Sequence, residues 1–260
     1  MSRRSSKPEP LPKKNKPGKD RLDILLVERG LAPSRQRAQA LLLAGQVRVD
    51  GVKADKAGAQ VSTDARIEIA GEQLRYASRA GLKLEGALED FALSPRDRVC
   101  MDVGSSTGGF TDYLLQNGAR KVFAIDVTID QLDWKLRQDA RVVTLEKNAR
   151  YLQPEDIAEP AEFVTVDVSF IAVSKILAAI VPLASAGADF VVLIKPQFEL
   201  EKRDVGKGGI VRDAALHQKA IDSVTQTAAA TGLEILGVRP SKLAGAEGNQ
   251  EFFLHARRRG

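Results

Sequence analysis

Residues Arg98–Leu115 read RVCMDVGSSTGGFTDYLL. An apolar run comes first, a loop of small residues with three glycines follows, and an amphipathic helix pattern begins after the loop. A strand, a glycine-rich turn and a helix in this order are typical of a nucleotide-binding site in an α/β protein. The stretch therefore predicts an α/β fold and leaves three ligands to compare: a pyrophosphate, a triphosphate, or a group without phosphate.

The chain beyond Arg98 alternates between strand-like and helix-like patterns. Five short apolar runs, RVCMDV, KVFAID, RVVTLE, EFVTVDV and DFVVLIK, are separated by helical segments, which predicts a parallel sheet covered on both faces. The last two runs, LEILGVRP and QEFFLHAR, are joined by only nine residues, too few for a helical crossover. We therefore expect a Rossmann-like domain over residues 76–260, with a mostly parallel sheet and a terminal antiparallel strand.

The N-terminal part divides into a tail and a small module. Residues 1–20 hold seven Lys or Arg, two acidic residues and four prolines, a composition that predicts a disordered basic tail. The tail is either a solvated end or an arm that binds nucleic acid. Residues 21–75 show two helical patterns and a hairpin signal at Asp50-Gly51, which predicts a small α+β domain.

Bulk composition narrows the class of protein. The 260 residues are 43% hydrophobic and 28% charged, with a net charge of +5. No apolar window approaches the roughly 18 residues of a membrane span, and the basic N-terminus lacks the apolar core of a secretory signal. Cys100 is the single cysteine, so we expect an inert packed thiol and no internal disulfide. A cytoplasmic protein without membrane attachment is expected, and its charge permits a polyanionic partner.

The glycine loop favours a ligand without phosphate. A triphosphate-binding loop needs a lysine directly after its last glycine. Gly108 and Gly109 are followed by Phe110 and not by a lysine. Ser106 stands where a dinucleotide-binding loop has its second glycine, so NAD is disfavoured, although this argument leaves it open. Asp102, at the end of the first strand, suits an ammonium or sulfonium group. S-adenosylmethionine carries both groups and no phosphate, and it is the predicted cofactor.

Further residues are expected around this cofactor. Asp126 ends the second strand and is expected to accept hydrogen bonds from the ribose hydroxyls; the alternative is a helix N-cap. Asn148 and Ala149 follow the third strand and are expected to border the adenine. The predicted cofactor-binding residues are Asp102, Gly104, Ser105, Ser106, Gly108, Gly109, Phe110, Asp126, Asn148, Ala149 and Asp167.

A lysine ends the fifth strand, at the edge of the sheet where ligands bind. Lys195 is either a surface lysine or a group that accepts or orients the proton of a substrate hydroxyl. A lysine accepts a proton only when neutral, which burial and a second cation favour, and Lys83 is the candidate cation. Asp167 and Glu251 are expected to orient the two lysines.

The small module resembles a known RNA-binding domain. The stretch LDILLVERGLAPSRQRAQALLLAGQVRVDGVKADKAGAQV is similar to the S4-like domain of ribosomal proteins and RNA pseudouridine synthases. In that family the arginine-bearing helix binds structured RNA through phosphate and shape. The resemblance implies RNA contacts for Arg35, Arg37 and Gln39; on the residues alone, a merely solvated helix face is the alternative.

The second domain also resembles a family. Lys83, Asp167, Lys195 and Glu251 are similar to the Lys-Asp-Lys-Glu tetrad of FtsJ-type ribose 2′-O-methyltransferases. Together with YASRAGLKLEGAL, DVSFI, GKGGIVRD and EGNQEFF, they identify the chain as resembling the TlyA-type, hemolysin-named methyltransferases over residues 21–257. The resemblance implies a catalytic tetrad and S-adenosylmethionine-dependent 2′-O-methylation of cytidine in ribosomal RNA of the large or small subunit. Ala80 departs from the family, which usually has glycine there.

Two other functions stay open on the sequence. A ribosome-binding factor without catalysis would need only the N-terminal module, and a cytolysin would need a membrane-inserting segment. His217 and His255 lack the spacing of metal ligands, so no metal is predicted. A monomer that binds ribosomal RNA is the expected state.

Overall fold

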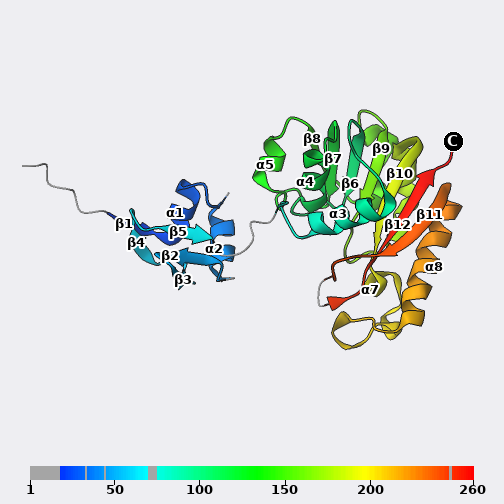
Figure 1. The fold of residues 1–260 in the computed structure, drawn as a ribbon. Helices are drawn as coiled ribbons and strands as arrows, with labels where there is room; N and C mark the ends of the chain where they lie inside the picture. The colour runs from blue at the N-terminus through cyan, green and yellow to red at the C-terminus, as the bar shows by residue number, and fades with distance from the viewer. Residues whose placement is uncertain (1–17, 33, 44, 70–74, 246–247) are drawn as a thin grey trace, which may run out of the picture. The chain divides into compact units, whose positions relative to one another are not determined.

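A computed structural model describes residues 18–32, 34–43, 45–69, 75–245 and 248–260. The chain forms two compact units, Met1–Gln73 and Leu74–Gly260 (Figure 1). Residues 1–17 lie outside the described residues, so the disordered tail stays a prediction there. Lys19 and Asp20, which composition assigned to the tail, belong instead to strand β1 and pair with strand β4. The folded part of the first unit therefore begins before residue 21.

The first unit contains two helices and two small sheets among its described residues. Strand β1 pairs with β4, and β2 lies between β3 and β5, all antiparallel. Leucines of both helices pack on Val47 and Ile67 of the second sheet. The element bounds are β1 Lys19–Arg21, α1 Leu22–Glu28, α2 Arg35–Leu43, β2 Val47–Val49, β3 Val52–Ala54, β4 Gln60–Ser62 and β5 Ile67–Ile69.

Local signals explain where these elements turn and begin. Val49 pairs with Val52, so Asp50 and Gly51 form a two-residue turn, and both have positive φ (49° and 83°). This is the conformation that an Asp-Gly hairpin requires. Ser34 Oγ accepts a hydrogen bond from the Arg37 backbone N–H at 3.2 Å, as expected of a helix N-cap.

The second unit is built on one sheet. Within residues 75–245 and 248–260 seven strands lie in the order β11-β12-β10-β9-β6-β7-β8. The strands are β6 Val99–Val103, β7 Lys121–Asp126, β8 Val142–Glu146, β9 Ala161–Val166, β10 Ala184–Ile194, β11 Leu233–Pro240 and β12 Phe252–Arg258. Strands β6 to β10 pair in parallel, whereas β12 pairs antiparallel with both β10 and β11. The predicted mostly parallel sheet with one antiparallel strand is confirmed.

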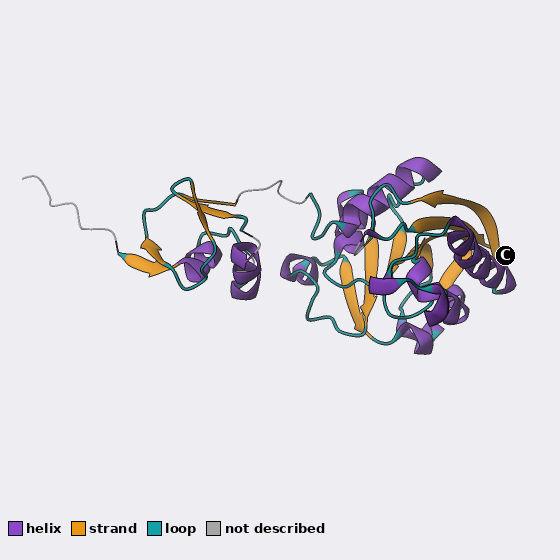
Figure 2. Ribbon diagram, turned by 90° about the horizontal axis from the view of Figure 1, so that it is seen from below, coloured by secondary structure: helices purple, strands orange, loops and turns teal. Residues whose placement is uncertain are grey.

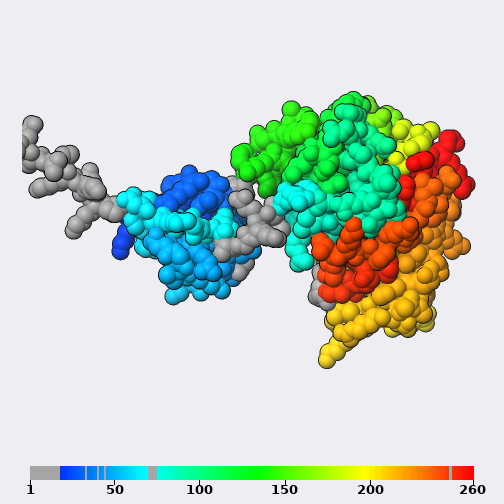
Figure 3. Space-filling view, in the orientation of Figure 1, coloured from blue at the N-terminus to red at the C-terminus, as the bar shows by residue number. Residues whose placement is uncertain are grey.

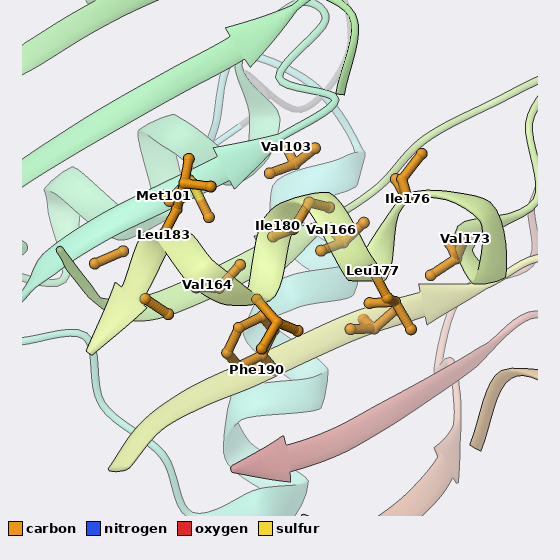
Figure 4. Close-up of a cluster of buried hydrophobic side chains, with 14 of the residues drawn as sticks. Met101, Val103, Val164, Val166, Val173, Ile176, Leu177, Ile180, Leu183 and Phe190 are labelled. Carbon is orange, nitrogen blue, oxygen red and sulfur yellow. The ribbon is translucent and has the colours of Figure 1, made fainter. Parts of the chain in front are cut away.

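Helices cover both faces of this sheet (Figures 1 and 2). Helices α3, α4 and α5 pack on the face that includes Cys100 and Phe163, and burial raises the pKa of the Cys100 thiol to about 12. Helices α6 and α8 cover the face that includes Met101 and Phe190 (Figure 4). The helices are α3 Ala80–Phe91, α4 Gly109–Gln116, α5 Trp134–Gln138, α6 Leu177–Ile180, α7 Pro196–Glu199 and α8 Ala214–Ala230.

Several predicted helices are shorter than their patterns. The apolar run 171–184 predicts one helix, but it divides into the 3₁₀ turns η3 Val173–Lys175 and η4 Val181–Leu183 on either side of α6. Pro182 has no N–H to continue the helix, which explains the last break. The remaining 3₁₀ turns are η1 Ala149–Tyr151, η2 Pro154–Asp156, η5 Lys202–Asp204 and η6 Lys207–Gly209.

Candidate active site

The carboxyl ends of the parallel strands gather the predicted site residues at one edge of the sheet. Gly104 follows β6, Asp126 ends β7, Asp167 follows β9 and Lys195 follows β10. In a sheet of this kind ligands bind outside these strand ends. Because β12 runs antiparallel to β10 and pairs Phe252 with Ile194, the residue before β12 also lies at this edge. That residue is Glu251.

The glycine loop after β6 is closely packed. Gly104 has φ 88°, and a Cβ there would overlap the backbone carbonyl of Asp167. Gly109 begins α4, and a Cβ there would overlap the Ser78 hydroxyl and press on Ala80. Glycine is therefore required where the loop approaches its neighbours, and the loop lies directly against the residue that follows β9.

A cavity of about 130 Å³ lies between the loop and the ends of β9 and β10. It is smaller than the roughly 300–1,000 Å³ of a pocket that encloses a whole drug-sized ligand. The Ser105 hydroxyl is buried here and has no hydrogen-bond partner among the described residues, which leaves it available to a ligand. The predicted site residues that line the cavity are Gly104, Ser105, Ser106, Gly109, Phe110, Asp167 and Lys195.

Five predicted cofactor residues do not line this cavity: Asp102, Gly108, Asp126, Asn148 and Ala149. Asp102 is fully buried; its carboxylate accepts hydrogen bonds from the hydroxyls of Thr111 at 2.6 Å and Thr165 at 2.9 Å. Burial raises the pKa of Asp102 to about 7. These hydrogen bonds link β6, β9 and α4, and the expected contact of Asp102 with the cofactor stays a prediction. A Cβ on Gly108 would meet Leu136, so Gly108 serves helix packing.

Asp126 and Asn148 both bind backbone near the loop. Asp126 Oδ2 accepts a hydrogen bond from the Ser106 N–H at 2.8 Å, so this carboxylate holds the glycine loop in place. Its other oxygen, Oδ1, accepts a longer hydrogen bond from the Thr128 N–H at 3.4 Å. Asn148 Oδ1 accepts from the Arg150 N–H at 3.0 Å, and Ala149 packs partly on the core. These residues follow the ends of β7 and β8, which pair side by side.

The four residues of the predicted tetrad form two ion pairs. Lys195 Nζ lies 2.6 Å from Asp167 Oδ1, and Lys83 Nζ lies 2.6 Å from Glu251 Oε2. Their side chains are largely buried, with exposed fractions of 11% and 17% in the first pair and 14% and 2% in the second. Opposite charges attract one another at this distance, so each ion pair holds its two side chains in a fixed position.

A loop before β12 encloses Glu251. The Ser241 N–H donates to the Glu251 carbonyl at 2.8 Å, and a Cβ on Gly245 would overlap the Glu251 carboxylate. Lys242 in the same loop pairs with Glu89 of α3 at 2.9 Å. In Figure 3 the orange-red surface of the segment before β12 lies against the teal surface of α3. Helix α3 also carries Lys83, so one contact surface brings both partners of the second ion pair together.

Three site residues were missed by sequence reasoning. Ser169 Oγ lies 2.9 Å from Lys195 Nζ. Phe170 is 93% exposed and has φ 65°, a backbone conformation that is strained for a bulky residue. Its ring lies 5.5 Å from the ring of Phe198, over which Lys195 Nζ lies at 6.0 Å. The sequence holds no signal for an exposed Phe170, because phenylalanine in an apolar run is usually buried.

The predicted RNA-binding residues do not share one environment. All three lie on α2. Arg37 is exposed. Arg35 and Gln39 instead bind the buried carboxylate of Asp23, at 2.8 and 3.1 Å. Their contact with a buried anion 12 and 16 residues away was not expected, and the RNA contacts of all three residues stay a prediction.

The two histidines lie apart from the tetrad. His217 Nε2 lies 2.9 Å from the Val211 carbonyl oxygen, and His255 Nε2 lies 3.0 Å from Asp189 Oδ1. Among the described residues, no three His, Cys, Asp or Glu side chains come together as a metal site would require. In the same residues, no helix is both long and apolar enough to span a membrane.

Comparison with known proteins gives matches to both units. Residues 76–258 match the FtsJ-like methyltransferase family, and residues 20–67 match the S4 domain. The 16S/23S rRNA (cytidine-2′-O)-methyltransferase TlyA of Mycobacterium tuberculosis is 47% identical over 239 residues, which cover 91% of this chain and 89% of that protein. Hemolysin A of Brachyspira hyodysenteriae is 41% identical over 237 residues, which cover 90% of this chain and 98% of that protein.

A solved structure agrees with these matches. A hemolysin-named protein from Streptococcus thermophilus superimposes with a TM-score of 0.72 and 41% identity, covering 93% of this chain and 89% of that chain. The resemblances predicted from the motifs of both units are confirmed.

Proposed function

Because the chain belongs to the FtsJ-like methyltransferase family and carries an S4 domain, we propose that it methylates ribosomal RNA. The proposed reaction transfers a methyl group from S-adenosylmethionine to the 2′-oxygen of a cytidine ribose in the large or small subunit. Relatives at 47% identity are named for this reaction, and the chain covers most of their length. A ribosomal RNA substrate implies a cytoplasmic site of action.

One observation supports this chemistry above the others: the Lys195–Asp167 pair lines the same cavity as the glycine loop. A ribose hydroxyl is a weak nucleophile until it shares or loses its proton. Lys195 Nζ is the proposed atom that receives or orients this proton. Nζ donates a hydrogen bond to Ser169 Oγ and lies 2.6 Å from Asp167 Oδ1, which has no hydrogen-bond partner among the described residues. An ammonium nitrogen has three N–H groups, so Nζ can also bind a substrate hydroxyl.

The residues around the cavity fit the predicted cofactor. S-adenosylmethionine supplies an electrophilic methyl group on a sulfonium, together with an ammonium, a carboxylate and an adenosine. The unpartnered Ser105 hydroxyl is a proposed contact for its polar methionine end. Asp126, at the end of β7, is the proposed acceptor for the ribose hydroxyls. Gly104 and Gly109 let the loop lie directly against Asp167 and Ser78, and these residues together form the wall of the cavity.

The remaining tetrad residues have a proposed supporting role. Glu251 neutralises Lys83 beside the cavity wall formed by Ser78 and Ala80. Phe170, exposed beside Ser169, is the proposed platform for the base of the target nucleotide, because RNA bases that leave a stack are commonly held on aromatic rings. Transfer at a ribose oxygen requires the attacking oxygen and the methyl group to be aligned, so this placement contributes much of the rate.

The proposal is tested with the full chain, S-adenosylmethionine and ribosomal subunits from a strain that lacks the modification. We expect 2′-O-methylcytidine to appear in the RNA, as mapped by mass spectrometry of nuclease fragments, and to be absent with Lys195→Ala. Methylation of a base would contradict the proposed chemistry. Tight binding to subunits without methyl transfer would identify a ribosome-binding factor without catalysis.

A further inference from the structure

The first unit holds a fully buried carboxylate that binds four side-chain N–H groups. Asp23, the second residue of α1, has an exposed fraction of 0%. Its Oδ1 accepts from Arg21 Nε at 3.0 Å. Its Oδ2 accepts from Arg21 Nη2 at 3.0 Å, Arg35 Nε at 2.8 Å and Gln39 Nε2 at 3.1 Å. One aspartate therefore connects the end of β1 with the first two turns of α2.

This arrangement leaves part of each guanidinium in water. The side chain of Arg35 is 55% exposed and that of Arg21 is 38% exposed. Arg35 uses only its Nε on Asp23, so its two terminal nitrogens keep their N–H groups for another acceptor. Because both arginines bind the same oxygen of Asp23, their guanidinium groups are held next to each other.

A contribution to folding stability does not by itself explain why a buried carboxylate with two arginines stands at this position. A buried ion pair must offset the desolvation of its charges, and well-packed apolar residues of similar size often serve a fold equally well. The hydrogen bonds from Arg21 in particular hold the pKa of Asp23 well below its usual range, so the carboxylate stays charged. The cluster of two cations and one anion keeps a net positive charge that faces solvent on the arginine side.

We infer that Asp23 is a positioning residue for RNA recognition: it fixes Arg21 and Arg35 as a paired guanidinium fork for RNA backbone phosphates. A fork that is already ordered loses less side-chain freedom on binding than two mobile arginines would. Gln39 then supports the fork from within, and Arg37 contributes a separate exposed charge. The inference rests on the proposed function, because it takes ribosomal RNA as the ligand.

The direction in which Asp23→Asn changes the RNA affinity distinguishes a positioning role from a purely electrostatic one. Asp23→Asn removes a negative charge from the face that meets a polyanion, so charge alone predicts tighter RNA binding. Loss of positioning predicts weaker RNA binding. In the wild type the side chains of Arg21, Arg35 and Gln39 donate to two carboxylate oxygens of Asp23, whereas asparagine has only one side-chain oxygen to accept their hydrogen bonds. Glu28→Gln is the matched control, since Glu28 is an exposed carboxylate at the end of the same helix.

The experiment measures the dissociation constant of the full chain for unmodified ribosomal subunits across a salt series. We expect Asp23→Asn to bind about five- to tenfold more weakly at low salt, with the slope of log K against log salt reduced by about one unit. Glu28→Gln should bind as tightly as the wild type or slightly more tightly. The affinity for S-adenosylmethionine, a property of the other unit, should not change in either variant.

A second variant covers the case in which Asp23→Asn does not fold, as judged by circular dichroism. Arg35→Lys keeps the positive charge but removes the Nε donor and the fork, so we expect it also to bind more weakly. A folded Asp23→Asn protein that binds as tightly as the wild type overturns the inference. So does wild-type affinity in Arg35→Lys if Asp23→Asn is unfolded. Wild-type protein that fails to bind subunits would instead overturn the proposed function, and the inference with it.

Discussion

Lys83 Nζ lies 2.6 Å from Glu251 Oε2, although the two residues are 168 positions apart in the chain. Lys83 lies in the first turns of α3, before the sheet begins, and Glu251 precedes its last strand. The pair therefore closes the second unit, and it does so at the edge where the cavity lies. Its Glu251 carboxylate is 2% exposed, which makes the contact sensitive to the loss of either charge.

Glu251→Gln should lower both stability and activity moderately. The amide leaves the Lys83 ammonium without a counter-charge in a largely buried place, so we expect a loss of about 1–3 kcal/mol in the free energy of unfolding. Methyl transfer should fall less than in Lys195 variants, because Glu251 orients a neighbour. A double-mutant cycle with Lys83→Met, followed by the fluorescence of Trp134, the single tryptophan of the chain, measures the coupling. Additive effects would contradict a direct pair.

Asp126→Asn should weaken the binding of S-adenosylmethionine by about 1–3 kcal/mol, the range for hydroxyl partners left unsatisfied. Asparagine can still accept from the Ser106 N–H, which Asp126 Oδ2 does at 2.8 Å, so the loop should keep its shape. The other group of the asparagine side chain is an NH2, which cannot accept hydrogen bonds from the ribose hydroxyls as the carboxylate oxygen does. Calorimetry measures the affinity, and RNA binding is the control. Unchanged cofactor affinity would show that Asp126 serves only the loop.

Phe170→Ala should lower methyl transfer with little effect on stability. A stacked base contributes about 1–3 kcal/mol, whereas the ring of Phe170 is 93% exposed and buries little apolar surface in the folded chain. We expect weaker binding of ribosomal subunits or a lower kcat, an unchanged affinity for S-adenosylmethionine, and a melting temperature close to that of the wild type. Phe170→Trp should restore activity and Phe170→Leu should not, because only the former presents a π-face. Full activity in the leucine variant would leave Phe170 with no stacking role.

Asp102 should give the second unit a pH-dependent stability. The pKa of Asp102, about 7 in the folded chain, exceeds its value of about 4 in an unfolded chain. The folded state then keeps a proton that the unfolded state releases, so this contribution is fully present below about pH 4 and is lost as the pH rises through 7. Asp102→Asn imitates the protonated form and should remove the effect.

The difference in unfolding free energy between wild type and Asp102→Asn should therefore change by up to about 1.4 kcal/mol per pH unit between pH 4 and 7, in favour of the variant as the pH rises. Urea unfolding followed by Trp134 fluorescence measures it. Asp130→Asn, at a carboxylate that is 95% exposed, is the control and should show no such trend. A constant difference for Asp102→Asn would mean that the buried carboxylate is ionised throughout.

The parts of the fold that were predicted are those set by local pattern. Near-continuous β-branched runs mark buried parallel strands, and Asp50-Gly51 marks a turn that few other dipeptides allow. Lys195 was singled out because a charged side chain at the end of an apolar strand needs a reason. Lys83 lies on α3 instead, and its pairing with Glu251 follows from the contact of α3 with the segment before β12.

The parts that were not predicted depend on which way a side chain points or on a distant partner. Asp102 shares the strand phase of Cys100, so its side chain faces the α4 side of the sheet and meets Thr111. Strand alternation contains this information, but the ligand argument considered only the residue's place at the strand end. Arg35 looked solvated because its partner Asp23 lies on another helix, and an arginine-rich helix start has the same pattern with or without such a partner.

Lys195 should matter for chemistry and not for binding. Lys195→Ala removes the proposed proton acceptor, so single-turnover methyl transfer at saturating RNA and cofactor should fall about 100-fold or more. Lys195→Arg should be nearly as poor, because a guanidinium keeps its proton and is broader than the ammonium that fits between Asp167 and Ser169.

Matched measurements separate this role from a structural one. Lys175→Ala, at an exposed lysine of η3, removes an equal charge from the neighbouring segment and should leave the rate unchanged. The affinities of Lys195→Ala for S-adenosylmethionine and for ribosomal subunits should stay within about threefold of the wild type, since a transition-state contact changes kcat more than binding. Near-wild-type turnover in Lys195→Ala would exclude the mechanism. Full activity in Lys195→Arg would reduce Lys195 to a fixed positive charge, because no proton could then pass to it.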